Sequence, residues 1–240
     1  MKYLSILITV LSVISCTTPQ SDDGNFKVEY KGALKNAMHI GDISAKANLS
    51  DFKEIHHFYA LGAFENLKGE IQIFNSKPFN TFVEDSNLIF DNSFINKATL
   101  LVYASVDKWK IISIPEDVST YKQVEKYIEQ TAKENQINID EPFPFLIEGT
   151  VKSFDWHVIN WNDGDMEHTH EKHKTSGLYG TINDRKIEML GFYSNAHHTI
   201  FTHNTTNMHI HMKTADNKLA GHVDGLTLEK GMVLKLPEIK

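Results

Sequence analysis

The chain has 240 residues, which suffices for one large domain or two small ones with a substantial buried core. Its composition, 41% hydrophobic and 23% charged, is that of an ordinary globular protein. The formal net charge of -7 argues against a nucleic-acid partner, which would favour a basic face. After the N-terminus, no stretch is long and apolar enough to span a membrane.

The first residues of the chain predict a targeting signal that covers residues 1–15. Lys2 supplies a positive start, and residues 3–14 form an apolar run too short for a spanning helix. The following Cys16 is the only cysteine, and the run LSVISC that it ends resembles a bacterial lipobox. The alternative is an ordinary signal peptide.

The lipobox resemblance implies cleavage before Cys16 and lipid attached to it. The protein is then expected outside the cytoplasm, anchored to a bacterial membrane only through this lipid. The outer membrane is favoured because Thr17 provides no inner-membrane retention signal. Residues 16–27 are expected to form a polar, flexible tether.

The predicted helices are few. Residues 28–38 have apolar side chains at helical spacing, and Ser50 is a candidate cap for a short helix through Ile55. Residues 121–134 are the clearest helix, because apolar residues share one face and a Thr-x-x-Gln capping box precedes them. A proline-containing link at 138–144 is the candidate domain boundary.

The predicted strands dominate the rest of the chain, so the fold class is α+β. A turn at 66–69 precedes the first of them, and the polar, histidine-rich residues 161–175 are expected to form a surface loop. The predicted strands cover residues 70–74, 88–90, 99–106, 110–114, 145–159, 181–182, 187–193, 208–213 and 226–236.

Three histidines between residues 207 and 223 form a candidate metal site. His209 and His211 lie on the same face of a strand because successive side chains alternate between faces. A turn at 216–218 would bring His222 back beside them on a second strand. Three imidazoles with no fourth protein ligand nearby suit an open catalytic zinc site, although alternate histidines are also common on a merely polar strand face.

Several ordered motifs resemble the acetolactate decarboxylase family over roughly residues 30–236. The family's N-terminal motif is similar to GAFENLKGE at 62–70, and a family strand carrying Gly-Thr is similar to FLIEGTVK at 145–152. A Gly-Phe stretch is similar to residues 191–193. The C-terminal motif, His-Ile-His followed by Ala-Gly-His-Val at 220–223, is the most specific.

The resemblance implies two packed, mixed β-sheet lobes with a zinc ion held between them by His209, His211 and His222. We expect an N-terminal α+β lobe at 28–140 and a C-terminal β lobe with the metal site at 141–240. The implied reaction converts 2-acetolactate, or a related 2-hydroxy-3-keto acid, to acetoin and CO2.

Glu70 matches a glutamate that the family places at the metal, although a solvated turn carboxylate is the other interpretation. Two features depart from the family's pattern. The family has an arginine near the metal where this chain has His157, which is shorter and mostly neutral at pH 7. No residue matches the glutamate of the family's C-terminal tail.

The departures leave an alternative function, a catalytically impaired metal-binding or ligand-binding surface lipoprotein on the same fold. His157 is assigned to the catalytic group together with Glu70. A homodimer is a common default for such domains.

Further histidines lie outside these motifs. His168, His170 and His173 form either an accessory metal site, with His170 and His173 within ligand reach, or a solvated loop. Three more histidines either line the edge of the site or are ordinary surface residues: His197, His198 and His203.

Overall fold

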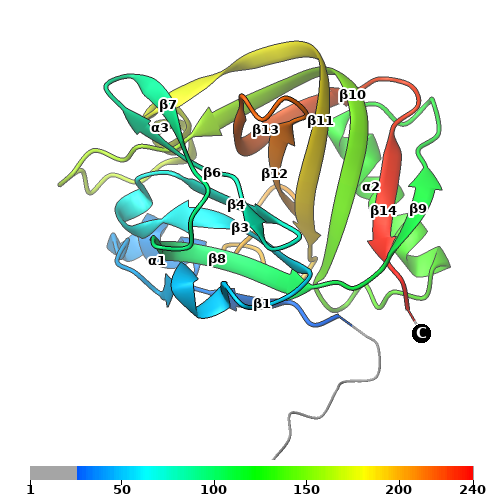
Figure 1. The fold of residues 1–240 in the computed structure, drawn as a ribbon, viewed down its shortest axis with the longest axis horizontal. Coiled ribbons are helices and arrows are strands. Elements are labelled where there is room, and N and C mark those ends of the chain that lie inside the picture. Colours follow the sequence, from blue (N-terminus) through cyan, green and yellow to red (C-terminus); the bar gives the residue numbers. More distant parts are fainter. Residues whose placement is uncertain (1–25, 240) are drawn as a thin grey trace, which may run out of the picture.

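The protein folds into two β-sheets that face each other, and a computed structural model describes this fold for residues 26–239 (Figure 1). The strands between Glu29 and Ser105 form the first sheet, and those between Trp109 and Pro237 form the second. The predicted signal peptide, Cys16 and most of the tether lie outside the described residues. Within the described part of the chain, no helix is long and apolar enough to cross a membrane.

The first sheet has eight strands in the order β1-β8-β3-β4-β6-β7, with β2 beside β8 and β5 beside β4. Its strands are β1 (Glu29–Lys31), β2 (Ala47–Asn48), β3 (Phe58–Phe64), β4 (Glu70–Phe74), β5 (Lys77–Pro78), β6 (Asn80–Glu84), β7 (Asn87–Asp91) and β8 (Lys97–Ser105). The helical elements here are α1 (Leu34–Ile40) and the 3-10 turns η1 (Leu49–Phe52) and η2 (Glu65–Leu67).

The two predicted N-terminal helices are shorter than expected. The segment 28–38 begins with β1, and a helix follows only after Gly32, whose φ of 78° interrupts any continuous helix. A Cβ at Gly32 would lie 2.1 Å from the Thr99 carbonyl oxygen, so this close approach requires glycine. The helix predicted from Ser50 through Ile55 is the single turn η1.

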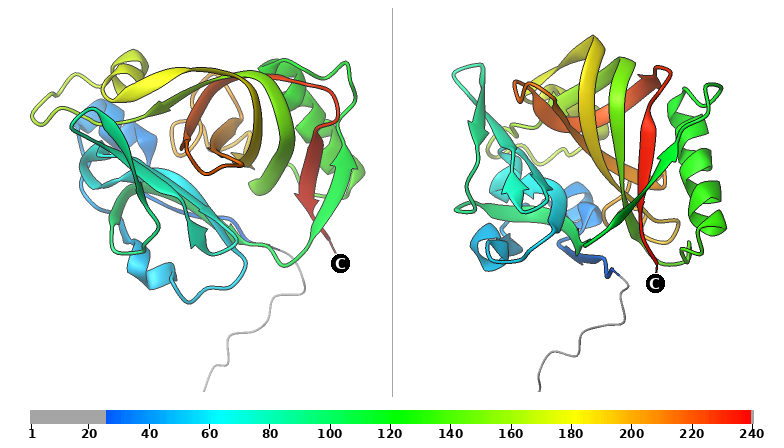
Figure 2. Two further views of the ribbon diagram at one scale, coloured as in Figure 1. Left: turned by 45° about the horizontal axis from the view of Figure 1, so that its top comes forward. Right: turned by 45° about the vertical axis from the view of Figure 1, so that its right-hand side comes forward.

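The second sheet has six strands in the order β11-β12-β13-β10-β14-β9, and an additional β10–β11 pairing closes part of it on itself (Figure 2). Its strands are β9 (Trp109–Ser113), β10 (Phe143–Val158), β11 (Leu178–Tyr193), β12 (Met208–Thr214), β13 (Ala220–Leu228) and β14 (Val233–Pro237). The helices in this half are α2 (Tyr121–Glu134) and α3 (His170–Thr175).

The α+β fold with two β-sheet lobes is confirmed. The pairings between the named strands are all antiparallel, so the expectation of sheets mixed in strand direction is wrong. The physical reason is the connections: tight turns such as 75–76 and 215–219 join antiparallel neighbours, whereas parallel neighbours need a long crossover.

The strand predictions in the second half are right in type but not always in extent. Residues 181–182 and 187–193 belong to one long strand, β11, which pairs with β10 along nearly its whole length. The stretch 226–236 is instead split between β13 and β14. Gly231, with a φ of 79°, lies in the turn between them.

The helix predicted at 121–134 is confirmed as α2. Its first turn is held by the Gln123 side chain, whose Oε1 accepts the Thr120 backbone N–H at 2.9 Å. Val124 and Ile128 on its inner face are fully buried against the second sheet.

The two sheets pack through an apolar layer. Leu61 and Val102 of the first sheet share a buried cluster with Leu146, Leu190 and Phe192 of the second. Burial of this kind is the main force that holds the two lobes together.

Sheet membership changes between β8 and β9, whereas the link predicted as the domain boundary, 138–144, lies between α2 and β10. Sheet membership alone does not define a domain, so the division at residue 140 stays a prediction.

Candidate metal centre and active site

The three predicted histidine ligands come together on the β12–β13 hairpin. His209 and His211 share one face of β12, and His222 of β13 lies directly opposite His211. Ile210 points to the other face of β12 and packs in the core of the second lobe. The hairpin predicted from the sequence is thereby confirmed, including its turn at 216–218.

The ring nitrogens of these histidines converge on one point. His209 Nε2 lies 3.1 Å from His211 Nε2 and 3.2 Å from His222 Nδ1. Ligands at zinc-like distances around a tetrahedral ion are separated by about 3.3 Å. The spacing of the three nitrogens therefore fits a shared divalent metal ion.

Gln72 of β4 fixes the orientation of His211. Its Nε2 donates to the Phe79 carbonyl oxygen at 2.5 Å and to Thr81 Oγ1 at 3.1 Å, so its Oε1 is left as an acceptor. His211 Nδ1 lies 3.1 Å from that Oε1 and donates its proton to it. The lone pair of His211 Nε2 then faces the shared point, as metal ligation requires.

Burial keeps the three ligands neutral. Desolvation lowers the pKa of His209 to about 3, and it lowers the pKa values of His211 and His222 well below the usual range. A neutral imidazole has a free lone pair, so these histidines are ready to bind metal at neutral pH.

Glu70, at the start of β4, faces the same point from the first sheet. Its Oε2 is 3.7 Å from His211 Nε2, and its Oε1 accepts the Ile159 backbone N–H at 3.1 Å. Glu70 is 4% exposed, and this burial raises the pKa of its carboxyl to about 7, against the opposing effect of His157. Glu70 is therefore no solvated turn residue.

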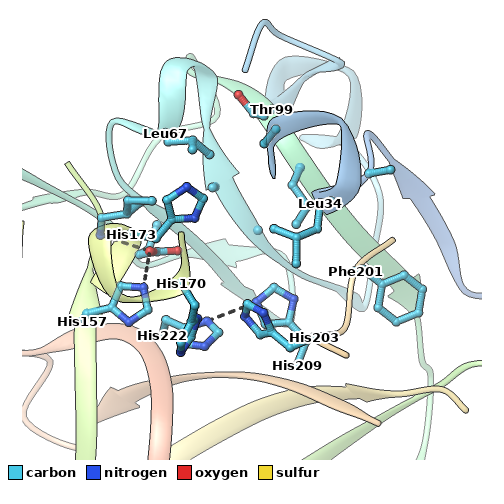
Figure 3. A pocket seen from close by; sticks show the side chains of 17 residues that line it. Leu34, Leu67, Thr99, His157, His170, His173, Phe201, His203, His209 and His222 are labelled. Atoms are coloured by element: carbon cyan, nitrogen blue, oxygen red, sulfur yellow. Dashed lines mark hydrogen bonds and ion pairs between the residues drawn. The ribbon is translucent and has the colours of Figure 1, made fainter. Parts of the chain in front are cut away.

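His157 of β10 completes a row of three histidines across neighbouring strands. It pairs with His222 of β13, and His222 pairs with His211 of β12. Its Nε2 is 3.7 Å from Glu70 Oε1, and its Nδ1 is 2.9 Å from Asp224 Oδ2. The structure thus brings all five predicted site residues together, and Figure 3 shows His157, His209 and His222 among them.

A pocket opens onto these groups between the two sheets and α1. Figure 3 shows His157, His209 and His222 on one side of it and Leu34, Leu67 and Thr99 on the other. Much of its wall is apolar, formed by Ala33, Leu34, Ala37, Ala63, Leu67, Leu100, Ile159 and Phe201. Among the described residues that line it, there is neither lysine nor arginine.

The second histidine group is arranged differently from its prediction. His168, not His170, meets His173, with 2.9 Å between Nδ1 and Nε2, and Trp161 stacks against His168. The accessory pair His170–His173 stays a prediction: both histidines line the pocket, and among the described residues no group of three possible metal ligands includes either of them. His170 contacts His203 at the pocket.

Of the three histidines proposed for the edge of the site, one lines the pocket. His203 lies there, with a ring centroid 6.1 Å from that of His222, and burial lowers its pKa to about 4. His197 instead stacks on Phe201 and bonds Ser194, and His198 bonds Asn207.

Sequence reasoning missed Gln72 and Asp224. The alternation of β4 places Gln72 on the face of Glu70, and the alternation of an ideal β13 would place Asp224 on the face of His222. The available signal was a polar residue two positions along the strand from a predicted site residue, Gln72 from Glu70 and Asp224 from His222.

Comparison with solved structures defines the class of fold. A Staphylococcus aureus protein of unknown function similar to alpha-acetolactate decarboxylase gives a TM-score of 0.69 at 14% identity, covering 89% of this chain and 86% of that one. The alpha-acetolactate decarboxylase of Bacillus subtilis strain 168 gives 0.68 at 14% identity, with coverages of 89% and 86%. These likenesses establish an acetolactate decarboxylase fold.

The family to which the chain belongs is shown by its sequence. Residues 30–238 match the sequence profile of the family described as alpha-acetolactate decarboxylase, and the chain therefore belongs to that family. The search of curated proteins found no match.

Proposed function

We propose that the protein is a zinc-dependent decarboxylase that converts 2-acetolactate, or a related 2-hydroxy-3-keto acid, to acetoin and CO2. The observation that carries this proposal is the buried Glu70 carboxyl, 3.7 Å from a ligand nitrogen of His211 and at the wall of the pocket that His209 and His222 also line. Membership of the family supports it.

His209, His211 and His222 would hold the ion and leave its remaining positions open to the pocket. When bound, zinc polarises the substrate carbonyl and stabilises the negative charge that remains when CO2 leaves. The protein's own residues bind and orient the substrate and move the proton.

Glu70 is the proposed proton donor. Loss of CO2 breaks the bond to the carboxyl carbon and leaves its electron pair on the substrate, where a proton must be added to one face of the carbon. A carboxyl with a pKa of about 7 holds a proton near neutrality and can release it there. The Ile159 N–H then stabilises the carboxylate that remains.

His157 is the proposed substrate-binding partner of Glu70. Its Nε2 faces the pocket beside the Glu70 carboxyl and is too far from it, at 3.7 Å, for a direct hydrogen bond. A hydroxyl of the substrate can therefore donate a hydrogen bond to this nitrogen. Apolar walls such as Leu34 and Leu100 would keep water away from the reacting carbon.

A second candidate is a metal-binding or ligand-binding surface lipoprotein that keeps the fold without the chemistry. It is favoured by one observation, the absence of lysine and arginine among the described residues that line the pocket. A fixed cation would hold a substrate carboxylate at any working pH, whereas imidazole does so only weakly.

For the remainder of the chain we propose a lipid anchor on Cys16, a position outside the cytoplasm on a bacterial membrane, and no nucleic-acid partner. The net charge of -7 supports the last point. A homodimer is proposed as the assembly.

The test is acetoin formation from racemic 2-acetolactate by the full chain in detergent, loaded with zinc or treated with chelator. We expect turnover only with zinc. His211→Ala should lose both zinc binding and turnover, while Lys110→Ala on the exposed face of β9 should lose neither. Retained turnover in His211→Ala would exclude the proposed metal chemistry, and folded, zinc-bound protein without turnover would favour the second candidate.

A further inference from the structure

We propose that Asp224 is a positioning residue that holds two histidines at once, the metal ligand His222 and the pocket-facing His157. This inference deepens the proposed function and rests on it only in assigning those two roles. The contacts themselves are independent of which substrate the pocket accepts.

One carboxylate oxygen of Asp224 fixes the ring of His157. Asp224 Oδ2 is 2.9 Å from His157 Nδ1, and the two side chains are 6% and 7% exposed. A carboxylate is only an acceptor when ionised, so His157 donates its Nδ1–H. In the neutral ring, Nε2 then carries the lone pair toward Glu70 and the pocket.

The other oxygen faces the metal ligand. Asp224 Oδ1 is buried and has no hydrogen-bond partner, and it lies 4.0 Å from His222 Nε2. The opposite nitrogen, His222 Nδ1, is the one that joins the ligand cluster. A neutral histidine that binds metal through Nδ1 carries its proton on Nε2, the side that faces Oδ1.

The buried oxygen thus gains a partner when His222 ligates a metal. A movement of about 1 Å would turn the 4.0 Å separation into a hydrogen bond. A buried carboxylate oxygen left unpaired is costly, so this closure favours metal binding. Carboxylates behind ligating histidines fix the tautomer and raise the basicity of the ligand in the same way.

The backbone is built to place Asp224 here. Asp155 of β10 pairs with Gly225 and Trp156 pairs with Val223, so Asp224 is an extra residue without a partner on β10. Such a β-bulge re-aims a side chain and bends its strand. His222 lies just before the bulge, opposite His157, and the bulged carboxylate reaches both rings.

The consequence is a single carboxylate that links the metal centre to the substrate-binding histidine. A substitution at Asp224 should therefore weaken metal binding and, at the same time, release the fixed tautomer of His157, of His222 or of both. A residue with only a structural role would change neither in a protein that stays folded.

The experiment uses the zinc-loaded full chain in detergent with 15N-labelled histidine. Long-range proton–nitrogen spectra report the tautomer of each ring, and chelator competition reports zinc affinity. In the wild type we expect the His157 proton on Nδ1 and the His222 proton on Nε2. A wild-type spectrum with His157 protonated only on Nε2 would overturn the proposal without any variant.

Asp224→Asn retains the shape but keeps a single acceptor oxygen. We expect it to bind zinc 10- to 100-fold more weakly and to lose the fixed tautomer of at least one ring. Asp155→Asn is the matched control, since its carboxylate contacts Thr181 and neither histidine, and both readouts should stay unchanged. Unchanged affinity and tautomers in a folded Asp224→Asn protein, or a change in only one of the two readouts, would refute the linked role.

Both readouts are independent of decarboxylation. A protein with the predicted tautomers and zinc affinities but no acetoin formation would leave this inference standing and overturn the proposed function. The reverse result, turnover with a freely exchanging His157 tautomer, would overturn this inference alone.

Discussion

Gln72→Met tests whether the first sheet positions the metal ligands of the second. The side chain of Gln72 is fully buried, and methionine has similar volume but neither the acceptor nor the donor of the amide. The substitution leaves the His211 Nδ1–H and the Phe79 carbonyl oxygen without their partners. Thr81 Oγ1 keeps its bond to the Ala220 carbonyl oxygen.

The magnitude follows from these two orphaned groups. A buried polar group that loses its partner costs roughly 1–3 kcal/mol, so we expect the free energy of unfolding of the metal-free protein to fall by about 3 kcal/mol. We also expect a 10- to 100-fold loss of zinc affinity, because His211 loses the bond that fixes its tautomer.

Urea unfolding of the metal-free protein and zinc competition with a chelator measure the two effects. Gln130→Met is the matched control, because Gln130 is exposed on α2 and bonds only Glu134, and it should change stability by less than about 0.5 kcal/mol. If zinc affinity in a folded Gln72→Met protein equals that of the wild type, the proposed positioning of His211 by the first sheet is wrong.

The remaining predictions concern stability. Burial lowers the pKa of His173 to about 3, so between pH 6.5 and 3 the unfolded chain binds more protons and stability is lost as the pH falls. Between pH 7 and pH 4 the wild type should lose about 3 kcal/mol more than His173→Gln, and equal pH profiles in urea unfolding would contradict this. Gly191→Ala should destabilise by about 2–3 kcal/mol, because its Cβ would lie 2.1 Å from Phe145 Cζ. Gly180→Ala, on the same strand, meets Trp156 at an ordinary 3.5 Å, and thermal unfolding should show a clearly larger shift for Gly191→Ala.

Much of the metal site was predictable because its spacing is local. The alternation of side chains along a strand places His209 and His211 on one face, and the turn at 216–218 returns His222 to them. The α2 helix was equally local, since its cap and its apolar face lie within one stretch of chain. Glu70 and His157 came from the family resemblance, because nothing in their immediate sequence distinguishes them from surface residues.

The rest of the site depended on contacts between residues distant in sequence. Gln72 and His211 are 139 positions apart and meet because the two sheets face each other. His157 and Asp224 are 67 positions apart and meet because a β-bulge re-aims the carboxylate. Local sequence determined which side chains share a strand face. Which faces meet, and hence which buried polar atoms are paired and how their pKa values shift, was decided only by the packing of the two sheets.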